Sequence, residues 1–165
     1  MFKKITVDNW REPDEISSLF INVPLDEWIS IILEPNLREA VPIEIKKLFE
    51  VARGALVYGY FFYPLYTLGL EQLFRVAEAA VTRKCKTMEA PPAICKGDFQ
   101  KKVKYLVELK VIPNQKEDIW NAIRGLRNIA SHPQDQSILA PGEAIGKLSR
   151  IADEINSLFS NSSSY

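Results

Sequence analysis

The fold is decided by residues 42–81, whose sequence is PIEIKKLFEVARGALVYGYFFYPLYTLGLEQLFRVAEAAV. Apolar side chains recur there every three or four residues, which is the period of an α-helix with one buried face. Pro42 and Pro64 stand where each of two such stripes begins, and proline is tolerated in the first turn of a helix. The stretch therefore predicts two long helices that meet near Pro64. The alternative is one kinked rod of more than about 40 residues, which is long for a globular domain.

The same period continues on both sides of this stretch. It predicts further helices over residues 25–33, 99–110, 119–132 and 145–158. Asp98 is a plausible N-cap, residues 88–97 predict a loop because of their prolines, and residues 5–7 and 20–23 predict two short extended pieces.

We therefore expect an all-α protein built as an antiparallel helical bundle with four to five main helices. The bundle should span residues 41–159. Residues 1–40 are expected to form an N-terminal extension that packs on the bundle, and residues 160–165 a disordered tail. The length of 165 residues, 47% of them hydrophobic, suits one domain of this kind.

The composition also limits the chemistry. His132 is the only histidine, and the two cysteines, Cys85 and Cys95, are too few and too distant to complete a zinc site with it. We expect no metal and no cofactor. Nothing at the N-terminus is typical of a signal peptide, and the most apolar stretch, residues 55–73, is too interrupted to cross a membrane. These features predict a cytoplasmic protein with free thiols.

The charge is balanced in total and uneven along the chain. There are 21 basic and 21 acidic residues, which argues against a generally basic nucleic-acid coat. Residues 1–50 carry a net charge of −4, whereas residues 83–110, with eight basic and three acidic side chains, carry +5. This basic block is either a solvated face or a track for a phosphate backbone. The candidate RNA-binding residues within it are Lys101, Lys102 and Lys104.

One stretch concentrates side chains that can perform chemistry, residues 119–133, with the sequence IWNAIRGLRNIASHP. On a helix, five polar side chains follow one another along a strip that ends at the only histidine: Arg124, Arg127, Asn128, Ser131 and His132. Guanidinium groups bind phosphate through paired hydrogen bonds, and an imidazole transfers protons near neutral pH. The alternative is structural: His132 caps the helix end, and the arginines pair with Glu71 or Glu78 of a neighbouring helix.

Arg127, Asn128, three further residues and His132 resemble the signature of HEPN domains, in which an arginine is followed after four to six residues by a histidine. The surrounding order of helices is similar as well, with Glu71 as the central acid of the long preceding helix, and the resemblance covers roughly residues 42–158. It implies a helical bundle that acts as a homodimeric, metal-independent endoribonuclease, with one composite site at the dimer interface.

In that family resemblance, His132 would be the general acid or base, Arg127 would stabilise the transition state, and Asn128 would position the histidine or the phosphate. Arg124, Ser131 and Glu71 would support the site, the first two by helical geometry alone. Such an enzyme could serve as a toxin or as a defence or stress effector, and its antitoxin or other partner protein would then be encoded separately. A non-catalytic HEPN-like module that binds RNA, nucleotide or a protein partner is one alternative, and a purely structural bundle is another.

Overall fold

In the computed structural model, the described residues are 3–131 and 140–160, without the side chains of residues 126–131. Within them, every regular element is helical, which confirms the all-α prediction. The elements are α1 (Glu15–Phe20), α2 (Leu25–Leu33), α3 (Ile43–Tyr58), α4 (Leu65–Thr87), α5 (Pro92–Cys95), α6 (Phe99–Glu108), the 3-10 turn η1 (Asn114–Lys116), α7 (Glu117–Ser131) and α8 (Pro141–Phe159).

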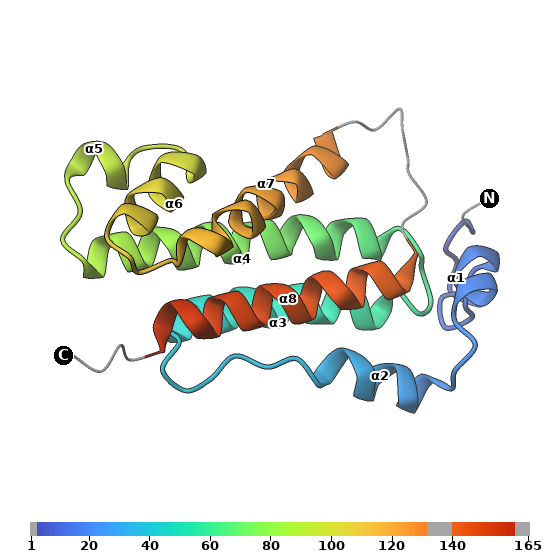
Figure 1. Cartoon of the computed structure of the whole chain (residues 1–165). Helices are drawn as coiled ribbons and strands as arrows, with labels where there is room; N and C mark the ends of the chain where they lie inside the picture. The colour runs from blue at the N-terminus through green and yellow to red at the C-terminus, as the bar shows by residue number, and fades with distance from the viewer. Residues whose placement is uncertain (1–2, 132–139, 161–165) are drawn as a thin grey trace.

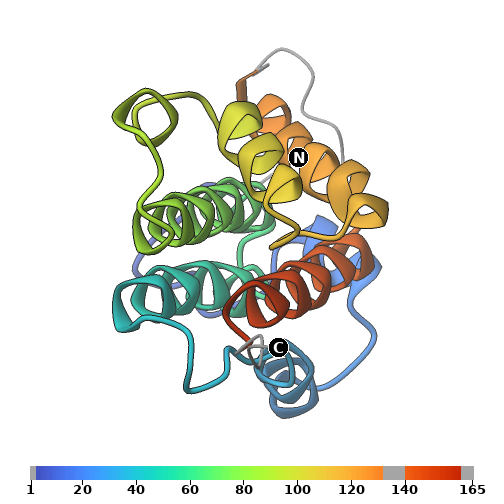
Figure 2. The same cartoon turned by 60° about the vertical axis from the view of Figure 1, so that its left-hand side comes forward.

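The long helix α4 is the centre of the bundle. It contacts α3, α6, α7 and α8, and α6 also contacts α7. In Figure 1, α3, α4 and α8 run along the length of the molecule, and α7 crosses α4 obliquely. Figure 2 shows the same helices closer to end-on, with α2 on the far side of α3 and α8 from α7. Helix α7, which carries the candidate motif, is thus held directly on the central helix.

Two glycines let α3 and α4 approach closely. A Cβ atom at Gly69 would stand 2.7 Å from Cδ2 of Leu56, and one at Gly59 would stand 2.7 Å from the Tyr66 ring. Both distances are shorter than side-chain carbons tolerate without a shift. The chain turns between the two helices at residues 59–64, so the prediction of two helices is confirmed and the single kinked rod is wrong.

The first 40 residues are attached to the bundle through buried side chains. Trp28 of α2 is 3% exposed, donates its indole N–H to the Leu56 carbonyl at 3.3 Å, and meets the Tyr66 ring edge-on at 5.8 Å. The Asn156 side chain of α8 binds the linker after α2 in both directions, accepting from the Arg38 N–H at 2.8 Å and donating to the Asn36 carbonyl at 2.9 Å. These contacts connect the start of the chain to α3, α4 and α8.

Asp14 joins the N-terminal segment to the turn between α3 and α4. Its carboxylate is buried, 2% exposed, and accepts from the Ser17 N–H as the N-cap of α1 and from the Tyr63 N–H, both at 2.7 Å. Together with burial, which is the larger cause, the Asp14 charge raises the pKa of the Tyr63 hydroxyl to about 12.

Replacing Asp14 with alanine is expected to lower the free energy of unfolding by about 2–3 kcal/mol, because two N–H groups lose a charged acceptor in a buried place. Urea unfolding followed by circular dichroism measures this loss. Asp8→Ala removes an exposed carboxylate and is the matched control, with an expected change within about 0.5 kcal/mol. Equal stability of the two variants would contradict the role of Asp14.

The sequence predictions were wrong in three short segments. Residues 5–7 and 20–23 form no strand, and Phe20 instead ends α1, a helix that the periodicity did not indicate. Residues 88–97 are mostly a loop, as predicted, but contain the four-residue helix α5 because Pro91 and Pro92 suit a first helical turn. Asp98 caps α6 as expected, accepting from the Lys101 N–H at 2.8 Å. The predicted disordered tail, from residue 161 onward, lies outside the described residues.

Candidate functional site

The candidate motif lies on α7, one face of which is anchored in the core. Trp120 is 1% exposed and Ile123 is 5% exposed, and the Trp120 ring lies 6.4 Å from that of Phe99 on α6. Arg124 and Gly125, one step further along the helix, are exposed to solvent. The amphipathic pattern read from the sequence therefore gives the correct orientation of α7 through residue 125.

The remaining motif residues fall in the last turns of α7 and beyond it. Helix α7 extends to Ser131, so Arg127, Asn128 and Ser131 belong to a continuous helix, although their side chains are outside the described part of the structure. His132 lies outside the described residues. The structure thus confirms the helix that carries the motif, and the convergence of the polar side chains stays a prediction.

Arg124 has a neutral partner. Its Nη1 atom donates to Oε1 of Gln100 on α6 at 2.8 Å, in an exposed position. The structural interpretation in which Arg124 pairs with Glu71 or Glu78 is therefore wrong for this arginine. Because an amide does not neutralise a guanidinium and no acid of the described residues pairs with it, Arg124 presents a positive charge at the surface shared by α6 and α7.

The three candidate lysines of α6 do not share one face. Lys101 and Lys104 are exposed, whereas Lys102 is only 7% exposed and donates its Nζ to Oγ1 of Thr82 on α4 at 3.0 Å. Lys102 lies one turn before Leu106, on the buried side of α6, so helical geometry turns it toward α4. The prediction that Lys102 contacts RNA is corrected accordingly, and Lys101 and Lys104 remain candidates.

Glu71 lies on the side of α4 that packs against α6. It precedes Phe74 by three residues, and the Phe74 ring packs 5.5 Å from that of Phe99 on α6. Glu71 is partly exposed, and no ion pair joins it to another described residue. Because α7 also packs on α4, an acid of α4 is a candidate partner for a cation of α7.

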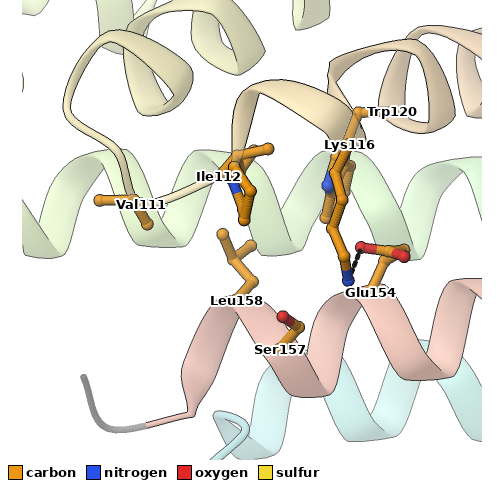
Figure 3. A pocket seen from close by; sticks show the side chains of 8 residues that line it. Val111, Ile112, Lys116, Trp120, Glu154, Ser157 and Leu158 are labelled. Carbon is orange, nitrogen blue, oxygen red and sulfur yellow. Dashed lines mark hydrogen bonds and ion pairs between the residues drawn. The ribbon is translucent and has the colours of Figure 1, made fainter. Parts of the chain in front are cut away.

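A partly buried ion pair that sequence reasoning missed joins η1, directly before α7, to α8. Lys116 Nζ lies 2.9 Å from Oε2 of Glu154, whose side chain is 5% exposed, in a small pocket beside Ile112 and Trp120 (Figure 3). Because Lys116 neutralises its charge, the Glu154 carboxylate has a structural role. No signal in the sequence connects these two residues, because they lie 38 positions apart.

A shallow groove of about 230 Å³ separates α7 from α8. Its lining is apolar with two cations: Ile119, Ala122, Ile123, Ile151, Lys147 and Arg150. Lys147 is paired with Glu143 at 3.1 Å. Among the described residues there is no group of three histidine, cysteine or acidic side chains that could hold a metal ion. None of the described helices combines the length and apolar character that a bilayer crossing needs.

No protein-family model, curated protein or solved structure matched the chain. The functional conclusion therefore depends on the residues and their arrangement.

Proposed function

We propose that this protein is a metal-independent endoribonuclease of the HEPN type, acting as a homodimer with Arg127, Asn128 and His132 in a composite site. One observation carries the proposal: Arg127, Asn128 and the rest of the polar strip up to Ser131 lie on one continuous helix, α7, which packs on the central helix α4. Such an enzyme would suit a toxin, defence or stress effector in the cytoplasm, restrained by a separately encoded protein.

The register of α7 supports a role for position 127. This position follows Trp120 by seven residues, Ile123 by four and the exposed Arg124 by three, so on the helix backbone it lies at the border between the buried face and the exposed strip. Glu71 belongs to α4, the helix that α7 contacts, and has no ion pair with a described residue. A carboxylate at this place would orient a guanidinium through paired hydrogen bonds, which makes Glu71 a positioning residue in the proposed site.

The charge around the motif suits a phosphate backbone. Arg124, Lys101 and Lys104 are all exposed, and Arg124 is joined to α6 through Gln100. Lys104 follows Gln100 by one helical turn, so it lies on the same side of α6 as the Arg124 contact. Exposed cations on two touching helices favour an RNA strand lying across α6 and the end of α7.

The proposed reaction needs no metal. The ribose 2′-oxygen attacks the adjacent phosphorus, a base removes the 2′-proton, and an acid protonates the departing 5′-oxygen, which leaves a cyclic phosphate. Arg127 would neutralise the charge that develops on the phosphoryl oxygens. Because each chain has one histidine, a twofold axis would supply the second one, so that one His132 serves as base and the other as acid.

The test is to incubate the purified protein with single-stranded RNA in EDTA. We expect fragments with 2′,3′-cyclic phosphate and 5′-hydroxyl ends, and a dimer by light scattering. Arg127→Ala should abolish the products, whereas Arg75→Ala, which removes an exposed arginine of α4, should not. Salt-sensitive RNA binding without any product would favour the non-catalytic module. If the protein neither binds nor cleaves RNA, the purely structural bundle is the remaining interpretation.

A further inference from the structure

Both cysteines of the chain lie at the junction of α4, α5 and α6, away from the candidate nuclease motif. Cys85 is in the last turn of α4 and fully buried, and Cys95 ends α5 and is partly exposed. Both are free thiols. Helix α5 contacts both α4 and α6, so the two cysteines belong to one packed corner of the molecule.

Ala90 connects the two cysteines directly. Its N–H donates to the Cys85 carbonyl at 3.0 Å, and its own carbonyl accepts from Sγ of Cys95 at 3.4 Å. The first of these bonds closes the end of α4, where Glu89 adopts a left-handed conformation with φ of 52° and reverses the chain. The segment from Cys85 to Cys95 is therefore folded back on itself, with the cysteines at its two ends.

The electrostatics agree with this proximity. The pKa of the Cys85 thiol is raised to about 11, chiefly by burial and to a smaller extent by the neighbouring Cys95, while the Lys102 ammonium and a backbone hydrogen bond act in the opposite direction. Sγ of Cys85 also lies 3.9 Å from the Lys102 carbonyl, which fixes the side chain between α4 and α6.

We propose that Cys85 and Cys95 are a redox modification site that closes to a reversible intramolecular disulfide when the protein meets a hydroperoxide. The Cys95 thiolate, which is accessible, attacks a peroxide oxygen and becomes a sulfenic acid as the first water leaves. The Cys85 thiolate then displaces the sulfenic hydroxyl, forming the S–S bond and releasing the second water. Two thiols lose two hydrogen atoms in total, and one hydrogen peroxide is reduced to two waters.

The burial of Cys85 assigns the two roles. A buried thiol with a raised pKa is a poor first nucleophile, so Cys95 is the residue that is attacked by solution reagents and Cys85 is the resolving residue. The bond would tie α5 to the last turn of α4. It would thereby restrain the loop that leads to Asp98, the cap of α6, and so connect the redox state to the helix that carries Lys101 and Lys104.

The experiment exposes the full-length protein to hydrogen peroxide, blocks the remaining thiols with iodoacetamide and maps tryptic peptides without reduction. Trypsin cleaves after Lys84, Lys86 and Lys96, so the disulfide joins the peptide 85–86 to the peptide 87–96. We expect this linked pair to account for most of the oxidised Cys95, to form independently of protein concentration, and to disappear with dithiothreitol.

Two variants separate the steps. Cys95→Ser, at the partly exposed position, should leave Cys85 reduced at the same peroxide dose. Cys85→Ala should leave a sulfenic acid on Cys95 that dimedone captures, with circular dichroism as the check that the variant is folded. The proposal is overturned if Cys95 of the unaltered protein is oxidised while Cys85 remains a thiol, if the link forms only between chains, or if neither native thiol reacts at a dose that oxidises the urea-unfolded protein.

Discussion

RNA cleavage is expected to fall by at least about 100-fold when His132 is replaced with alanine, because a positioned acid or base contributes about 10²–10⁴-fold to such a rate. The loss of activity should be larger than for a residue that serves only as acid or only as base, since one substitution removes both copies of the histidine from a homodimer. The measurement is the initial rate of cyclic-phosphate formation in EDTA. Imidazole added to the solution should restore part of the activity if the missing group is a proton carrier.

A mixed dimer tests whether the site is composite. When one subunit carries His132→Ala and its partner does not, a single shared site has lost either its acid or its base, and activity should fall far below half. Two independent sites would instead retain about half of the activity, which would contradict the composite site. Full activity of the doubly substituted dimer would remove His132 from the mechanism altogether.

Replacing Trp120 with alanine is expected to destabilise the protein by about 3–5 kcal/mol, the usual cost of removing a buried aromatic side chain from a core. Trp120 is 1% exposed and packs against Phe99, and it lines the same small pocket as Lys116 and Glu154. The substitution therefore opens a cavity where α6, α7 and α8 meet. Urea unfolding followed by circular dichroism gives the change in free energy.

The chain offers a matched control in Trp10. This tryptophan is 49% exposed, and its main contact is the Arg11 guanidinium 4.7 Å from the ring centroid, an interaction worth about 0.5–1 kcal/mol at an exposed site. Trp10→Ala should thus change stability several-fold less than Trp120→Ala. A loss below about 1 kcal/mol for Trp120→Ala would mean that α7 is not anchored as described.

The long helices could be predicted because their evidence is local. The apolar stripes of α3, α4 and α8 and the cap at Asp98 are each contained within a few turns of sequence. Helices α1 and α5 were not predicted, because helices of six and four residues are too short to show a periodic apolar pattern. Helix α1 depends instead on Asp14, whose carboxylate also binds the N–H of residue 63, and such a contact has no sequence signature.

The site was predictable in part for the same reason. The helix with Arg124 on its exposed face follows from spacing. The hydrogen bond from Arg124 to the Gln100 amide of α6 could not be predicted from spacing, because it depends on how the two helices cross. The sequence likewise grouped Lys102 with Lys101 and Lys104 because all three are basic. One step along a helix turns a side chain by about 100°, however, and this rotation places Lys102 in the interior.

The two hydrogen bonds of Asn156 have a consequence for the order in which the chain is completed. They join residues that are 118 and 120 positions apart. On a ribosome that releases the chain from its N-terminus, the linker at residues 36–38 cannot reach its partner until residue 156 has emerged. The linker after α2 is thus synthesised well before it can be held in place, and it is fixed only when α8 joins the bundle.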